Sequence, residues 1–171
     1  SVTIDATDLQ ALTNGNTYTI TADVDDAVGN SASQGSTTFV VDTTLLTISS
    51  ITPSWGSYLN LTEDDSDGTV TVATTNIEEG QTLTIALNGT DYTGSVSSNS
   101  VTITIVAADL QALTNGATYT ITANVSDVAG NAATQGTTTF IVDITPPSVS
   151  SFTMSDTALK IGDTSTVTLV F

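Results

Sequence analysis

The stretch DLQALTNGATYTITANVSDVAGN, at residues 109–131, decides the architecture because it occurs twice. A near-copy, DLQALTNGNTYTITADVDDAVGN, occupies residues 8–30, and the wider match aligns residues 1–44 with 102–145 without a gap. Thirty of those 44 positions are identical, at an offset of 101 residues. Such a period is too long for a solenoid unit and has the size of a whole small domain.

This repeat divides the chain into three parts. Residues 1–43 form the back part of one repeat, residues 44–145 a complete repeat, and residues 146–171 the beginning of the next. The parts join at VDTTLL and VDITPP, and the prolines of the second junction force extended backbone. Linkers this short and stiff predict a rod. The sequence opens directly on a strand-like run, so we expect a piece of a longer polypeptide.

The complete repeat has the pattern of an all-β domain. Its segment QTLTIAL (81–87) alternates apolar and threonine side chains, and Asn88-Gly89 then predicts a type I′ hairpin turn into TDYTGSV. Further strands are expected at residues 47–52, 57–61, 68–74, 100–106, 117–125 and 137–143. Seven or eight short β-branched strands predict tandem immunoglobulin-like Greek-key β-sandwiches arranged as a rod.

One segment, ADLQALTNG at 108–116, interrupts the strand pattern and predicts a single helical turn. We expect Asp109 to cap its start and Asn115-Gly116 to end it. The spacing then puts Tyr119 at the start of the next strand. That placement is similar to the tyrosine corner of immunoglobulin and fibronectin type III folds, whose hydroxyl bonds back to nearby backbone.

The charge balance excludes several classes of partner. The formal charge is −17, from 18 acidic residues against the single base Lys160. Nucleic acid and anionic membrane surfaces are disfavoured, because both require clustered Lys and Arg. No apolar run approaches the ~18 residues of a membrane span. Repulsion among the acids must be screened by salt or neutralised by bound metal ions.

Acidic and amide side chains gather in the loops at both ends of the expected sandwich. The N-terminal pole, where the preceding linker arrives, collects Asp42, Asn76, Glu78, Glu79, Asp127 and Asn131. The C-terminal pole, where the next linker leaves, collects Glu63, Asp64, Asp65, Asp67, Asp109 and Asp143. Oxygen ligands of this kind suit Ca²⁺, which takes about six to eight of them. Without His or Cys, zinc and copper are poor candidates. The alternative is that these acids only favour turns.

The succession TEDDSDGTVTVAT, IEEGQTLTIALNG, ADLQALTNGATYTITA and DVAGN, closed by VD, resembles the bacterial immunoglobulin-like repeats of giant secreted adhesins. These include the extender domains of RTX-type adhesins and repeats of very large marine bacterial surface proteins. The resemblance covers the whole chain. Two departures are the order DAVGN in the first copy and the missing proline in VDTTLL.

The resemblance implies a segment at the surface of a Gram-negative bacterium, stiffened by Ca²⁺ at its domain junctions. The positions that match the junctional motif are Asp26, Asn30, Asp42, Asp127, Asn131 and Asp143. Together with the loop residues Glu78 and Asp64 they are the candidate calcium ligands. The partners implied are neighbouring repeats of the same polypeptide.

The sequence bears on three classes of function. An enzyme is not expected, because no His or Cys is present and the carboxylates fall in turn-forming loops. A structural extender is favoured by the near-identity of the repeats. A carbohydrate- or ligand-binding module would need an exposed aromatic platform, for which Trp55 is the candidate, although it is more simply a core lid. Filaments formed by contacts between chains, including side-by-side association, are the third alternative.

Overall fold

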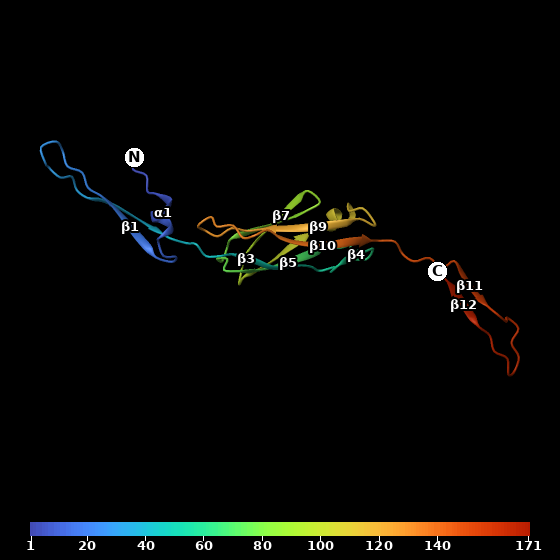
Figure 1. Ribbon diagram of the computed structural model, residues 1–171. Coiled ribbons are helices and arrows are strands. Elements are labelled where there is room, and N and C mark those ends of the chain that lie inside the picture. The colour runs from blue at the N-terminus through green and yellow to red at the C-terminus, as the bar shows by residue number, and fades with distance from the viewer.

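The computed structural model describes residues 1–171 as three groups of strands with two short helices. Figure 1 shows a central β-sandwich with a hairpin beyond either end. The first group is α1 (Ala6–Gln10), β1 (Thr17–Ala22) and β2 (Gly35–Val40), and the last is β11 (Ser151–Met154) and β12 (Val167–Val170). The central group is β3 (Thr47–Pro53), β4 (Tyr58–Asn60), β5 (Gly68–Thr75), β6 (Thr82–Leu87), β7 (Thr90–Ser95), β8 (Ser100–Ile105), α2 (Ala107–Gln111), β9 (Thr118–Asn124) and β10 (Gly136–Asp143).

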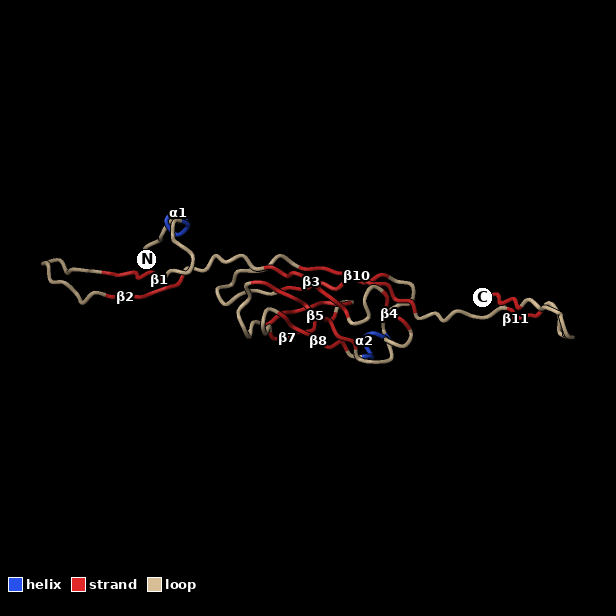
Figure 2. Tube along the Cα trace, turned by 90° about the horizontal axis from the view of Figure 1, so that it is seen from below, coloured by secondary structure: helices blue, strands red, loops and turns tan.

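Two sheets form the central sandwich. One has the strand order β3-β5-β8 and the other β4-β10-β9-β6-β7. Neighbouring strands are antiparallel, except that β4 runs parallel to β10. The chain crosses repeatedly between the sheets, as in immunoglobulin-like Greek-key sandwiches. The predicted all-β sandwich is therefore confirmed. In Figure 2 single loop segments connect this sandwich to the outer hairpins.

The core lies between the two sheets because strand residues alternate between facing inward and outward. Along β5 the inward positions include Val70 and Val72, which are fully buried. The packing is tight at Gly68, where a Cβ atom would lie 2.5 Å from the Trp55 ring. Trp55 itself is 6% exposed and meets Phe140 edge to face at 5.2 Å between ring centroids. It is a core residue, so the alternative of an exposed sugar-stacking platform is wrong.

The strands follow the sequence pattern closely, and each expected segment overlaps one of β3 to β10. Asn88 and Gly89 have φ values of 50° and 82°, as a type I′ turn requires. The predicted tyrosine corner is also confirmed, because the backbone N–H of Thr114 donates to the Tyr119 hydroxyl at 2.9 Å. The same bond joins Thr13 and Tyr18 in the first copy.

The expected caps of the helical turn are wrong. The N-cap of α2 is Val106, and the turn ends at Ala112, before Asn115-Gly116. The first helical N–H, that of Ala107, is satisfied from another loop, because Asp67 accepts it at 2.9 Å. The Asp109 carboxylate instead accepts the Tyr92 hydroxyl at 2.7 Å. A neighbouring loop has taken over the capping role that local sequence assigns to Asp109.

The bond between Tyr92 and Asp109 predicts a loss of stability in alkali. Burial, the hydrogen bond and the charge of Asp109 raise the pKa of Tyr92 from 10.0 to about 12. A raised pKa stabilises the fold below the unfolded pKa, and this contribution disappears as the pH rises through the folded value. We expect stability to fall between about pH 10 and pH 12 in the wild type and less steeply in Tyr92→Phe.

Tyrosinate absorbance and thermal melts across that range are the measurements. Tyr18 and Tyr119 serve as internal references, because hydrogen bonds from the Thr13 and Thr114 backbone lower the pKa of their hydroxyls. A wild-type protein whose tyrosines all ionise together near pH 10 would contradict the assignment.

The two outer hairpins have no second sheet to cover them. The fully and nearly buried side chains all lie between Leu46 and Val142. Ile121 in β9 is fully buried, whereas its repeat equivalent Ile20 in β1 is 41% exposed. The division at residues 44 and 146 remains a prediction, and the compact core falls inside it. No helix has the length and apolar character needed to cross a membrane.

Candidate metal centre

Three carboxylates meet at the N-terminal pole of the central sandwich. Oxygen atoms of Asp42, Glu78 and Asp127 all lie within 4.8 Å of one another, and we call these residues the junction group. Asp42 belongs to the linker after β2, Glu78 to the loop after β5, and Asp127 to the loop between β9 and β10. The three arrive from segments far apart in sequence, so the fold and not local turn preference brings them together.

Asp127 is fixed by its own loop. The backbone N–H of Asn131 donates to Asp127 Oδ1 at 2.7 Å, and Asn131 Nδ2 donates to Oδ2 at 2.8 Å. The intervening Gly130 has a φ of 94°, which a glycine adopts without strain. Asp127 is 5% exposed, and the two hydrogen bonds from Asn131 hold its carboxylate in one orientation. The turn thus explains the DVAGN motif, and it leaves the carboxylate charge without a cationic partner.

The first copy has the same loop, but without the contact to a linker that Asn131 makes in the second copy. Asp26 accepts the Asn30 backbone N–H at 2.9 Å and its Nδ2 at 2.7 Å. The Asn30 side chain and then the backbone N–H groups of Asn30 and Val28 lower the pKa of Asp26. The aspartate is therefore kept as a charged acceptor even though it is exposed.

The linker aspartate is oriented by the residue two positions on. The Thr44 backbone N–H donates to Asp42 Oδ1 at 2.9 Å. Hydrogen bonding from the Thr44 side chain and then from this N–H lowers the pKa of Asp42. Asn131 Nδ2 also donates to the Asp42 backbone oxygen at 3.0 Å, and Asn76 Nδ2 donates to that of Leu45 at 3.0 Å. Both bonds tie the linker to the pole of the following repeat.

Glu78 differs from the other two members of the junction group. It is exposed, and its carboxylate accepts no hydrogen bond in the structure. Its neighbour Glu79 instead accepts the Ser98 backbone N–H at 2.5 Å. The hydrogen bond from Ser98 therefore explains the Glu79 carboxylate, whereas no hydrogen bond explains the Glu78 carboxylate.

The donor set fits a hard divalent cation. Three carboxylates offer six oxygen atoms, close to the roughly six to eight that Ca²⁺ takes. Each oxygen that already accepts one hydrogen bond keeps a second lone pair for a ligand. Without a counter-ion, three negative charges at this separation repel one another. The residues present can therefore hold Ca²⁺, which would convert repulsion between two repeats into attraction.

The other candidate ligands lie elsewhere. Asp143 ends β10 at the C-terminal pole, and Asp26 and Asn30 lie in the first hairpin. Asp64 is also at the C-terminal pole, 6% exposed, with one carboxylate oxygen buried and unpaired. Of the eight residues expected from the sequence, the structure brings three carboxylates together and places Asn131 beside them. Sequence patterns assigned Asn115 only to the end of the helical turn, and they assigned no role to the side chain of Asn14.

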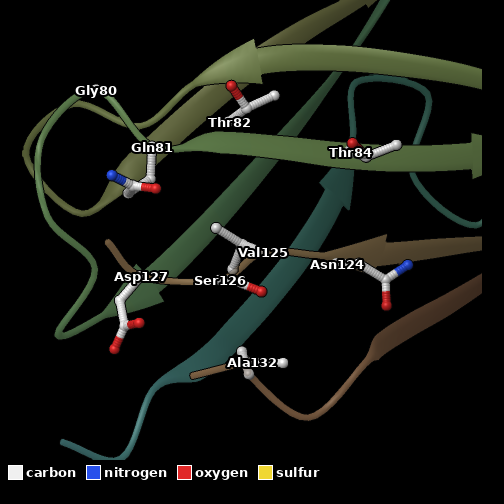
Figure 3. Close-up of a pocket in the computed structure, with 10 residues that line it drawn as sticks. Gly80, Gln81, Thr82, Thr84, Asn124, Val125, Ser126, Asp127 and Ala132 are labelled. Atoms are coloured by element: carbon white, nitrogen blue, oxygen red, sulfur yellow. The ribbon is translucent and has the colours of Figure 1, made fainter. Parts of the chain in front are cut away.

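A shallow groove begins beside the junction group, with Asp127 at one end in Figure 3. It opens where the start of β6 and the segment after β9 are no longer paired, because their register stops at Thr84 and Asn124. The lining residues are Gly80, Gln81, Thr82, Thr84, Asn124, Val125, Ser126, Asp127, Ala132 and Ala133. They offer hydroxyl and amide groups and no aromatic ring.

No protein-family model and no curated protein matches the sequence. Among solved structures, the chain is similar to a Ca²⁺-stabilized adhesin that helps an Antarctic bacterium reach out and bind ice (27% identity, TM-score 0.46, 81% of this chain and 34% of that chain). It is also similar to a 1.5-MDa bacterial ice-binding adhesin studied for host cell surface retention (27% identity, TM-score 0.44, 76% of this chain and 43% of that one).

A third similar structure is shorter. It is a bacterial immunoglobulin-like domain from the M. primoryensis ice-binding adhesin (29% identity, TM-score 0.43), and the match covers 57% of this chain and 99% of that domain. The chain thus spans less than half of the first two adhesin chains and the length of the single domain. In structure as in sequence motif, the chain is similar to bacterial immunoglobulin-like adhesin domains.

Proposed function

We propose that the chain is a structural spacer from a very large extracellular repeat protein, an adhesin or surface filament, in which Ca²⁺ fixes consecutive repeats. The observation that carries this proposal is the junction group itself. Asp42 precedes the complete repeat, whereas Glu78 and Asp127 belong to it. A cation shared by these three carboxylates would cross-link the linker to the body of the next repeat.

Repeat symmetry extends the same arrangement along the chain. Asp143 is the equivalent of Asp42, and Asp26 and Asn30 are the equivalents of Asp127 and Asn131. Asp143 would therefore serve the following junction, and Asp26 the preceding one. One cation at every boundary would make the array a rod, and prolines would stiffen the boundary after Asp143 further. Such a chain holds a functional domain at a distance from its anchor and needs no catalytic site.

A binding module is the weaker candidate. Its sequence signal was Trp55, and that ring lies in the core. The groove beside Asp127 lacks an aromatic surface on which a sugar ring could stack. Nothing specific in the structure favours contacts between chains over contacts between successive repeats. We therefore place the chain at the cell surface as a spacer, in keeping with its resemblance to adhesin repeats.

Calcium titration of the whole 171-residue chain tests this proposal. We expect calorimetry to detect a site that depends on the junction group. We also expect CaCl₂ to raise the melting temperature of the central repeat above its value in EDTA, because a ligand that binds only the folded state stabilises it. Trp55, the only tryptophan, reports unfolding of that repeat. The same melting temperature in Ca²⁺, Mg²⁺ and EDTA, with no heat of binding, would refute the proposal.

A further inference from the structure

An asparagine of the preceding repeat also holds the linker, through the residues after Asp42. The Thr43 backbone N–H donates to Asn14 Oδ1 at 2.7 Å, and Asn14 Nδ2 donates to Thr44 Oγ1 at 3.4 Å. Asn14 therefore binds the two residues that directly follow Asp42. We call this pair of bonds the amide latch.

The second copy has the same latch. The Ile144 backbone N–H donates to Asn115 Oδ1 at 3.0 Å, and Asn115 Nδ2 donates to Thr145 Oγ1 at 2.6 Å. The two linkers share Val-Asp and the latched threonine, Thr44 or Thr145, but they differ after it, because only the second one continues with prolines. The same contact therefore forms on two linkers that continue differently. This favours a role in setting the path of the linker backbone and not in forming one particular turn.

The latch residue is itself rigidly mounted. On one side, the preceding Thr13 is bound by the tyrosine corner. On the other, the Gly15 backbone N–H donates to the Val41 backbone oxygen at 2.7 Å, and Gly15 adopts a φ of 78°. The Asn14 amide is therefore fixed relative to the end of β2, from which the linker leaves. A short rigid path connects the tyrosine corner to the linker.

Amide side chains from both repeats thus meet on one four-residue linker segment. Asn14 holds residues 43 and 44 from the preceding repeat, and Asn131 and Asn76 hold Asp42 and Leu45 from the following one. All three are neutral, which suits a chain with 18 acids and one base. A carboxylate in these positions would add repulsion to the junction group, and no arginine is present to take its place.

We infer that Asn14 and Asn115 are positioning residues, whose amide latches direct the linker aspartate toward the carboxylates of the next repeat. The latch needs no cation, so the linker is ordered before Ca²⁺ arrives. The consequence for cation affinity rests on the proposed function, because it requires Asp42 to be a ligand. Preorganisation of this kind raises affinity by reducing the ordering that binding demands.

The first test measures the latch alone, by amide hydrogen exchange in EDTA on the ¹⁵N-labelled chain. In Asn115→Ala the Ile144 N–H should exchange about fivefold to tenfold faster, in line with the loss of about 1 kcal/mol of hydrogen bonding. Asn14→Ala should do the same to Thr43. Asn14→Asp keeps the acceptor oxygen and should retain the protection of Thr43. Unchanged exchange of Ile144 and Thr43 in the alanine variants would overturn the latch.

The second test measures calcium affinity. Asn14→Ala should raise the Ca²⁺ dissociation constant about threefold to tenfold. Without the latch, the binding of Ca²⁺ must also order the linker, and the free energy of that ordering reduces the affinity. The Trp55-detected melting temperature in EDTA should stay unchanged, since Asn14 lies outside the central core. Asn16→Ala is the matched control, because the second copy already has Ala117 there. Faster exchange of Thr43 with unchanged calcium affinity would overturn the positioning role. A wild type that binds no Ca²⁺ would refute the proposed function, while the exchange rates still decide the latch.

Discussion

Replacing Glu78 by glutamine is expected to change the stability of the central repeat in opposite directions with and without Ca²⁺. In EDTA the substitution removes one of three negative charges held within 4.8 Å, so the melting temperature should rise slightly, by the equivalent of ~0.5 kcal/mol. In Ca²⁺ the same substitution removes a charged ligand. The dissociation constant should then rise at least about tenfold, and the melting temperature should fall below that of the wild type.

Glu79→Gln is the matched control for this experiment. It makes the same change in net charge at the adjacent position, but Glu79 lies outside the junction group and accepts the Ser98 N–H. It should lower stability slightly in both buffers and leave calcium affinity unchanged. If the two variants behave alike, the effect of Glu78→Gln is a general charge effect, and the junction group is not a calcium site.

The sequence predicts much of this fold because the repeat is long and its strands alternate regularly. Strand positions, the Asn88-Gly89 turn and the tyrosine corner each depend on a few neighbouring residues, so local patterns suffice to find them. Assigning loops to poles also placed Glu78 and Asp127 on the same side as the linker. The domain topology inferred from the repeat therefore predicted which loops, far apart in sequence, lie at the same pole.

Sequence patterns did not predict the hydrogen bonds between loops. Asp67 caps the helical turn in place of Asp109, and no local pattern signals a bond between residues 40 positions apart in sequence. The amide latch was missed for a related reason. An Asn before Gly reads as a turn signal, and that local role conceals a side chain which binds a linker some 30 residues away. The repetition of Asn14 at Asn115 was the available clue.

Replacing Phe140 by alanine is expected to cause the largest loss of stability, about 3–5 kcal/mol. The ring is 1% exposed and lies between Trp55 and Tyr119, with centroids at 5.2 and 6.0 Å. Its removal leaves a cavity at the point where the two sheets meet, and β-sheets on either side cannot collapse fully to fill it. For a domain of about 100 residues, the melting temperature should fall by roughly 12 °C or more.

Phe39→Ala removes the same atoms from the first copy and serves as the control. Phe39 stacks on Tyr18 at 5.9 Å and 27°, nearly the geometry of Phe140 on Tyr119, but no second sheet covers it. The Trp55-detected transition should therefore be unchanged in Phe39→Ala. Equal losses in both variants would mean that the central repeat draws its stability from the preceding hairpin. A loss confined to Phe140→Ala would mean that the central repeat folds as a unit of its own, independently of the aromatic pair in the preceding hairpin.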